Sequence, residues 1–178
     1  WVVEVDSADD LPRVVEAAFT VAMSGRPGPV VVSLPEDVLR EAATTEPGPP
    51  VQVDERSPSV GDVDAVHDVL ATADRPVLLV GGGGWTTTGR MALRDLATRF
   101  DLPVVVTFRR HDLFDNTDDR YVGEAGVGMP PAVRETLVDA DVILAIGARF
   151  GEMTTGAYSL FGTDGTANDD QRIVHVHA

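Results

Sequence analysis

Residues 76–85 read PVLLVGGGGW, and this stretch decides the fold. Four apolar residues run directly into four glycines, and an amphipathic helix pattern follows, with one face at Leu93, Leu96, Ala97 and Phe100. An unbroken apolar run is typical of a strand that is buried on both faces of a parallel sheet. Glycines at its exit allow a sharp turn and a close approach of backbone N–H groups to a ligand. The stretch therefore predicts the first strand–turn–helix unit of a doubly wound α/β domain.

The same alternation continues to the end of the chain. We expect a helix from Gly61 to Ala73 before the opening strand, a helix that begins at Pro130 and Pro131, and further strands at 103–108, 141–147 and 173–177. Residues 109–128 are polar and glycine-containing, and we expect them to be irregular. Strands that alternate with helices imply parallel crossovers, so the sheet is predicted to be mainly parallel and Rossmann-like. Ligands of such sheets bind at the carboxyl ends of the strands.

The N-terminal third has a different organisation. Residues 1–39 are predicted to hold one complete helix–strand unit, with Asp9 and Asp10 as the helix N-cap and a strand at 29–35. The buried helix face is expected at Val14, Val15, Ala18, Phe19 and Ala22. Residues 40–60 contain four prolines and little periodicity, which predicts an extended linker. Residues 61–178 then form the main domain.

Composition narrows the possible functions. The 178 residues carry a formal charge of −15 and all 14 basic residues are arginines, which argues against binding to nucleic acid or to an anionic membrane. The absence of cysteine excludes disulfides and thiolate chemistry. No apolar run approaches the ~20 residues that span a bilayer, and no signal peptide is apparent. We therefore expect a cytoplasmic protein, truncated at both ends because the chain opens without methionine inside an apparent strand.

The glycine run invites a comparison with dinucleotide-binding turns. Gly81 and Gly83 give G-x-G, but the third glycine of that fingerprint is replaced by Thr86. The second strand ends at Phe108 and Arg109, where an NAD site requires an acidic residue for the ribose. These departures disfavour NAD. Two roles for the glycines remain open, namely tight packing of the turn against the sheet and contact with a nucleotide phosphate.

Other polar residues give no catalytic arrangement. His175 and His177 share one face of a strand but lack a third metal ligand nearby, and His111 is expected in a solvated loop. Glu124 and Glu152 are the only carboxylates placed at strand ends as a site requires. A cluster of acids resembles a calcium loop in charge alone, without its glycine and terminal glutamate: Asp112, Asp115, Asp118 and Asp119. The residues predict a binding scaffold with no catalytic residue and no metal site of its own.

Several stretches together resemble the thiamine-diphosphate-dependent enzymes of the acetolactate synthase type. The specific parts are GRPGPVVVSLPEDVL at 25–39 and AIGARFGEMTTG at 145–156. The segments PVLLVGGGGW, LPVVVTF, YVGEAGVG and RIVHVHA follow the order and approximate spacing of that family. The resemblance covers essentially the whole chain.

The resemblance implies a larger enzyme with three α/β domains. Residues 1–39 would be the end of the pyrimidine-binding domain, and residues 61–178 the central domain. The family's catalytic glutamate would precede Trp1, and its Gly-Asp-Gly motif for magnesium and diphosphate would follow Ala178. The parent would be a lyase or carboligase that acts on 2-keto acids with thiamine diphosphate and Mg²⁺, as a homodimer or homotetramer. This fragment would be inert and would depend on the remaining domains of that chain.

The family's central domain holds FAD in some members, ADP in others and nothing in several. The resemblance implies that the cofactor contacts would come from Gly81, Gly82, Gly83, Gly84, Gly123, Gly126, Gly128, Gly147, Ala148, Arg149 and Glu152. Two departures count against FAD, because an arginine of the synthases becomes Met153 and an aspartate becomes His177. An alternative interpretation is a stand-alone FAD- or ADP-binding module of the same fold.

Overall fold

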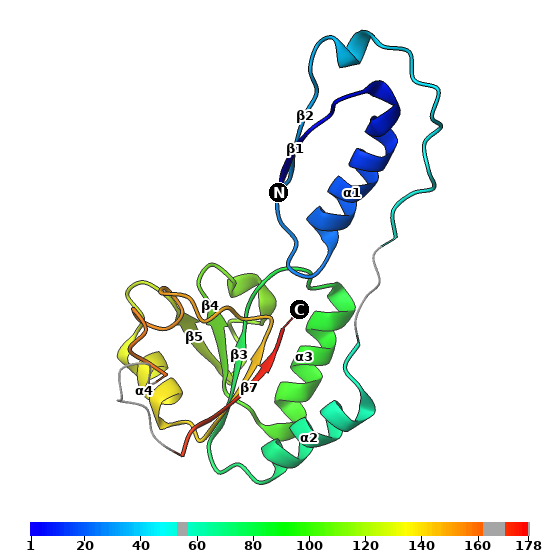
Figure 1. Ribbon diagram of the computed structural model, residues 1–178. Coiled ribbons are helices and arrows are strands. Elements are labelled where there is room, and N and C mark those ends of the chain that lie inside the picture. Colours follow the sequence, from blue (N-terminus) through cyan, green and yellow to red (C-terminus); the bar gives the residue numbers. More distant parts are fainter. Residues whose placement is uncertain (53–56, 162–169, 178) are drawn as a thin grey trace. The chain divides into compact units, whose positions relative to one another are not determined.

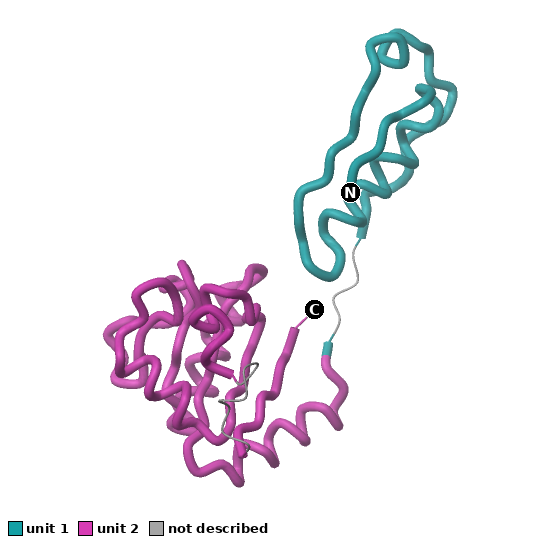
Figure 2. The backbone as a smooth tube through the Cα atoms, turned by 60° about the vertical axis from the view of Figure 1, so that its left-hand side comes forward, with its two compact units in different colours: residues 1–57, 178 teal, residues 58–177 magenta. Residues whose placement is uncertain are grey.

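The computed structural model describes residues 1–52, 57–161 and 170–177. The chain divides into two units, within residues 1–57 and 58–177 (Figure 2). Each unit has its own hydrophobic core. The assignment of the first unit to a pyrimidine-binding domain stays a prediction.

The second unit is built on a five-stranded sheet in which every pairing is parallel. Its strand order is β5-β4-β3-β6-β7 (Figure 1). The strands are β3 (Pro76–Val80), β4 (Val104–Thr107), β5 (Tyr121–Ala125), β6 (Val142–Ile146) and β7 (Arg172–Val176). The helices are α2 (Val60–Ala71), α3 (Thr87–Phe100) and α4 (Pro131–Asp139). The predicted doubly wound, mainly parallel α/β fold is confirmed.

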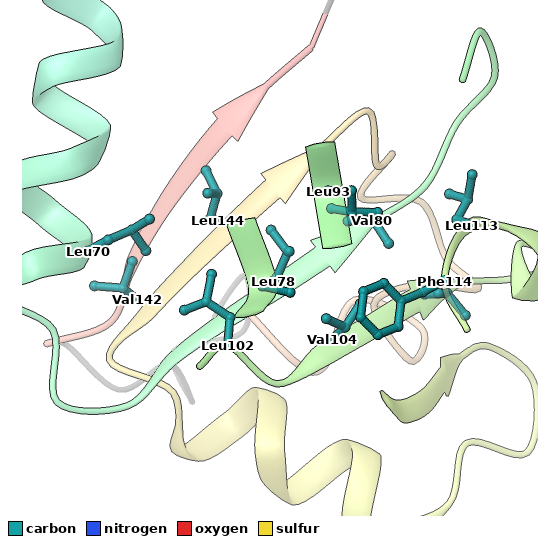
Figure 3. Close-up of a cluster of buried hydrophobic side chains, with 12 residues drawn as sticks. Leu70, Leu78, Val80, Leu93, Leu102, Val104, Leu113, Phe114, Val142 and Leu144 are labelled. Atoms are coloured by element: carbon teal, nitrogen blue, oxygen red, sulfur yellow. The ribbon is translucent and has the colours of Figure 1, made fainter. Parts of the chain in front are cut away.

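Alternate residues of the central strands face opposite layers of helix. Leu78 and Val80 of β3 belong to a core cluster with residues of α2 and α3 (Figures 1 and 3). Val77 and Leu79 of the same strand pack in a second cluster that includes Val133 of α4. These four side chains of β3 are each at most 3% exposed. The unbroken apolar run in the sequence is therefore explained by burial of β3 on both faces.

The expectation that residues 109–128 are irregular holds for residues 114–120 and 126–128 but is wrong for the rest of the segment after Arg110. This segment contains a short 3₁₀ helix, η3 (His111–Leu113), and the edge strand β5. Only the last residue of β5 is fully buried. The strand therefore does not need a continuous apolar sequence, and its sequence YVGEA has none. Gly123 lies inside the strand with φ +141°, and a Cβ at this position would approach Cγ2 of Val133 to 2.8 Å. The residue that interrupts the strand pattern is thus required for packing against α4.

The first unit contains two strands and one long helix. β1 (Val2–Glu4) pairs in parallel with β2 (Val31–Ser33), and α1 (Leu11–Met23) connects them; the short 3₁₀ helices are η1 (Ala8–Asp10) and η2 (Val38–Arg40). The prediction of one helix–strand unit missed the pairing of β1. In α1, Val14 and Ala18 are buried as expected, but Val15 and Phe19 are 38% and 55% exposed. The predicted buried helix face is therefore wrong at these two positions.

The predicted N-cap of α1 is confirmed in position, at Asp10, but not in its capping hydrogen bond. Asp10 occupies the cap position with helical backbone angles, and its side chain makes no capping hydrogen bond. The Asp9 carboxylate instead accepts hydrogen bonds from the backbone N–H groups of Thr44 and Thr45, at 2.6 and 2.9 Å. These bonds lower the pKa of Asp9. Asp9 therefore anchors the start of the proline-rich segment, in which the described residues 41–52 form no helix or strand.

Asp141 anchors the start of β6 and provides a pH-dependent contribution to stability. Burial alone would raise the pKa of Asp141, but hydrogen bonds from the backbone N–H groups of Asp74 and Arg75, at 2.6 and 2.9 Å, outweigh it and lower the pKa. The stabilisation is therefore present above the unfolded-state pKa and is lost as the pH falls through the lower folded-state value. We expect Asp141→Asn to lower the melting temperature at pH 7.

The difference between Asp141→Asn and the wild-type chain should shrink below about pH 4, near the ordinary pKa of an aspartate. Thermal melts by circular dichroism at pH 7, 5 and 3 measure this dependence. Asp139→Asn is the matched control, because it changes the same residue type two positions earlier without removing the bonds to Asp74 and Arg75. An equal loss of stability for Asp141→Asn at all three pH values would contradict the assignment.

Candidate functional site

The loops that follow the parallel strands all lie at one edge of the five-stranded sheet (Figure 1). Residues 81–86 follow β3, residues 108–112 follow β4, residues 126–130 follow β5 and residues 147–152 follow β6. Apart from Gly123, which lies inside β5, the predicted cofactor-binding residues are in these loops. Since ligands of parallel sheets bind at the carboxyl ends of the strands, this edge is the candidate site.

The first two glycines of the turn after β3 are closely packed. A Cβ on Gly81 would overlap the side chain of Thr107, and a Cβ on Gly82 would overlap the carbonyl oxygen of Gly147. Gly82 and Gly147 also have positive φ values of +70° and +64°. The Gly81 carbonyl accepts a hydrogen bond from Nε1 of Trp85 at 2.7 Å. Packing therefore accounts for these three glycines.

The last two glycines of the turn are in a different environment. A Cβ on Gly83 or Gly84 would meet no atom within 4 Å, and both residues are exposed. Thr86, which replaces the third glycine of the dinucleotide fingerprint, caps α3 by accepting a hydrogen bond from the Gly89 N–H at 3.0 Å. Space for the approach of a ligand is thus available at Gly83 and Gly84, and the contact of these residues with a phosphate stays a prediction.

Glu124 is the centre of a polar cluster at the end of β5. Its carboxylate pairs with Nε2 of His111 and accepts a hydrogen bond from the Arg109 N–H at 3.3 Å. Nδ1 of His111 lies 2.9 Å from the hydroxyl oxygen of Tyr121. Burial, with a smaller effect of the Glu124 charge, raises the pKa of Tyr121. His111, expected in a solvated loop, therefore connects two residues of β5.

Sequence reasoning missed Arg109 and Tyr121 in this cluster. Tyr121 and Glu124 lie on a strand that the sequence did not reveal, so their meeting with His111 was not predictable from spacing. Arg109 has a left-handed backbone with φ +63°, and its guanidinium lies 4.9 Å from the ring centroid of Phe108. The sequence signal that could have pointed to Arg109 is the pair of arginines, Arg109 and Arg110, directly after a buried strand.

The segment after β6 contributes several of the predicted cofactor contacts. Ala148 is fully buried, whereas Arg149, Glu152 and Met153 are exposed. The Ala148 carbonyl lies 2.8 Å from Nε2 of His175. Gly126 is closely packed, because a Cβ there would approach Oε1 of Glu124 to 2.5 Å, whereas Gly128 is open with φ +72°. The roles of these residues in cofactor binding stay predictions.

His175 lies in β7, and His177 follows directly after the last residue of that strand. Their ring centroids are 5.2 Å apart, and the ring of Phe150 packs edge-on against His175 at 5.0 Å. Within residues 1–52, 57–161 and 170–177, no group of three or more histidine, aspartate or glutamate side chains is arranged to hold a metal ion. The hydrogen bond to Ala148 gives His175 a structural role between β7 and the loop after β6.

The acidic cluster between β4 and β5 forms local contacts. The Asp112 carboxylate pairs with Arg110 through two hydrogen bonds, at 2.9 and 3.0 Å. Asp115 accepts from the backbone and hydroxyl of Thr117, and Asp118 accepts from the backbone of Arg120. These bonds lower the pKa of each of the three carboxyl groups.

A shallow depression of about 350 Å³ lies between α3 and the loop after β4. Sequence reasoning did not identify it, because its residues come from segments that are separate in the chain. One end of the Arg90 guanidinium lies 4.0 Å from Asp112 in this depression. The lining residues are Thr87, Arg90, Met91, Arg94, Asp112, Leu113, Phe114 and Asp115.

Comparison with known families identifies this architecture. Residues 63–178 match the model described as "Thiamine pyrophosphate enzyme, central domain". The chain belongs to the thiamine pyrophosphate enzyme family. The match covers the five-stranded sheet and the glycine turn, and it confirms the resemblance seen in the sequence. Among the described residues of the whole chain, no helix is long and apolar enough to cross a membrane.

Relatives of this thiamine pyrophosphate enzyme domain extend the match into the first unit. The acetolactate synthase large subunit of Parasynechococcus marenigrum is 36% identical over an alignment of 167 residues, and the alignment covers 90% of this chain and 27% of that protein. The large subunit of acetolactate synthase isozyme 2 of Escherichia coli is 32% identical over 157 residues, and the alignment covers 88% of this chain and 29% of that protein. The mitochondrial acetolactate synthase catalytic subunit of Saccharomyces cerevisiae is 33% identical over an alignment of 176 residues, which covers 92% of this chain and 26% of that protein. The chain thus spans less than a third of the length of these relatives.

Proposed function

We propose that this chain is the central part of a thiamine-diphosphate-dependent enzyme that decarboxylates or ligates 2-keto acids. The observation that carries the proposal is the family match over residues 63–178, which is supported by the similarity to acetolactate synthases. Because the chain corresponds to about a quarter of those proteins, the activity belongs to a longer parent chain. The proposal includes a homodimeric or homotetrameric parent whose subunits contact each other largely through its other domains.

The described residues do not fit a site for magnesium and diphosphate. They contain no group of three carboxylate or imidazole side chains suited to a metal ion. We therefore assign the binding of thiamine diphosphate and Mg²⁺ to other domains of the parent. The cofactor supplies carbanion chemistry when it is bound there. This chain serves as a spacer between those domains. In it, the loops after β3 and β6 are in close contact where Gly82 packs against Gly147.

A second candidate function is a nucleotide-holding module. The open space at Gly83 and Gly84 and the exposed Arg149 favour it, since backbone N–H groups and a guanidinium suit phosphate oxygens. Met153 counts against FAD, because a thioether does not replace the bidentate donor of an arginine. For this chain, thermal melts with FAD, with ADP and with thiamine diphosphate plus Mg²⁺, each tested separately, are expected to show no shift. A shift of several degrees with FAD would favour the module.

The parent enzyme provides the direct test of the proposed activity. We expect the intact protein that contains this chain to consume pyruvate or another 2-keto acid only when thiamine diphosphate and Mg²⁺ are both present. The measurement is the loss of keto-acid absorbance, with release of CO₂ followed in parallel. Removal of the cofactor by dialysis against a chelator should abolish turnover, and re-addition should restore it. Failure to consume any member of a panel of 2-keto acids would contradict the proposal.

A further inference from the structure

Arg109 differs from the other residues after β4 in its backbone and in its side chain. Its φ of +63° is in the left-handed region, which is unfavourable for side chains other than glycine or asparagine. Such strained residues persist where their surroundings over-determine them, and they cluster at functional sites. Arg109 stands two positions after Thr107, whose side chain packs against Gly81 of the turn after β3. The strained residue therefore lies at the carboxyl edge of the sheet.

A set of contacts holds Arg109 in this conformation. Its N–H donates to Oε2 of Glu124 at 3.3 Å, and its guanidinium stacks over Phe108. The Glu124 side chain is only 18% exposed and is itself fixed by His111. Tyr121 contacts the second nitrogen of His111 at 2.9 Å. We call Phe108, His111, Tyr121 and Glu124 the Arg109 brace.

The neighbouring arginines Arg109 and Arg110 differ in their ion pairs. Arg110 is neutralised by two hydrogen bonds to Asp112, at 2.9 and 3.0 Å. For Arg109, no carboxylate of the described residues lies within ion-pair distance of the guanidinium, and the residue is exposed. The Arg109 guanidinium is therefore held over the Phe108 ring, at 4.9 Å from its centroid, and forms no ion pair within the described residues.

We propose that Arg109 is a preorganised receptor for an oxyanion, the phosphate or carboxylate group of a ligand bound at the carboxyl edge of the sheet. The planar guanidinium fork donates two parallel hydrogen bonds to two oxygens of such a group. The Arg109 brace fixes the backbone and places the guanidinium over Phe108 in advance, so that less freedom is lost when the anion binds. The brace residues are positioning residues. This inference is independent of the thiamine-dependent activity proposed for the parent.

Binding of small anions to the full 178-residue chain tests the proposal. Inorganic pyrophosphate and pyruvate are the two probes, since they represent a phosphate and a carboxylate. The readouts are isothermal titration calorimetry and the ¹⁵N–¹H resonance of the Arg109 Nε group. Arg109→Gln is expected to weaken binding of the preferred anion at least about tenfold, and Arg110→Gln, the matched control, less than twofold. The probe that shows this contrast identifies the class of oxyanion.

Two further variants separate the roles of strain, charge and positioning. Arg109→Gly suits the left-handed backbone, so it should abolish binding without lowering the melting temperature. Gly126→Ala leaves the Arg109 charge intact but places a Cβ 2.5 Å from Oε1 of Glu124 and 2.9 Å from Cδ2 of Phe108. We expect it to weaken binding several-fold, through displacement of the brace, and to broaden or shift the Arg109 Nε resonance.

Three results would overturn the proposal. The first is that neither anion binds the wild-type chain at millimolar concentration. The second is that Arg109→Gln leaves binding of both anions unchanged. The third is an equal loss in Arg109→Gln and Arg110→Gln, which would show a general effect of net charge. None of these results depends on turnover of a keto acid, so failure here is distinguishable from failure of the proposed function.

Discussion

Gly82→Ala is expected to lower the free energy of unfolding of the second unit by about 3 kcal/mol. The left-handed backbone, with φ +70°, contributes ~1–2 kcal/mol of strain for any residue with a Cβ. The new methyl group would also overlap the Gly147 carbonyl oxygen, and relief of such a collision costs about 1–3 kcal/mol more. Because the obstacle is backbone, side-chain rotation cannot relieve it. For a unit of this size the melting temperature should fall by roughly 10 °C.

Urea denaturation followed by tryptophan fluorescence measures the effect of Gly82→Ala. A Trp1→Phe background leaves Trp85, whose indole is bonded to the Gly81 carbonyl beside the mutation, as the reporter. Gly83→Ala is the matched control, because a Cβ at Gly83 would meet no atom within 4 Å. Its effect should stay below about 1 kcal/mol. Equal effects of the two substitutions would show that the interlock with Gly147 is not what constrains the turn.

Ile143→Ala should destabilise the second unit by about 3 kcal/mol. Ile143 lies in the middle of β6, is fully buried and packs in the cluster that faces α4. Removal of its side chain loses the transfer free energy of three carbons and leaves a cavity that the surrounding residues fill only in part, which typically costs 2–5 kcal/mol. The same urea titration of Trp85 fluorescence reports the change.

Ile173 provides an unusually close control for Ile143. It is the residue directly paired with Ile143 in the register of β6 and β7, so both substitutions remove the same side chain from neighbouring strands. Ile173 is 41% exposed on the edge strand, and we expect Ile173→Ala to cost less than about half as much. A larger effect at Ile173 than at Ile143 would contradict the assignment of the core to the centre of the sheet.

The central strands were predictable from the sequence because burial on both faces leaves a continuous apolar run. β3, β4 and β6 all have this composition, and the expected ranges enclose the observed strands. β5 was missed because it is an edge strand in which four of five residues are only partly buried. Val15 and Phe19 of α1 are apolar and fit the helical period, so the sequence predicted that they are buried. In the structure no described residue covers them, and a periodic pattern alone does not reveal this.

The candidate site was predictable in its location but not in its contacts. The carboxyl edge followed from the alternation of strands and helices, and the glycines marked the turn. Gly82 is closely packed and Gly83 is open because the loop after β6 comes close to Gly82 alone. No local sequence pattern encodes this contact between two distant loops. The meeting of His111 with Glu124 likewise depends on a strand pairing between β4 and β5 that includes a register shift.

The central position of β3 has a consequence for how the chain is made. β3 leaves the ribosome first among the five strands, yet one of its two flanking partners, β6, is among the last to follow. Until residues 142–146 have been synthesised, one hydrogen-bonding edge of an apolar strand has no partner. Exposed edges of this kind recruit strands from other molecules. Translation of the second unit therefore passes through a stage at which an unpaired edge of β3 is open to aggregation.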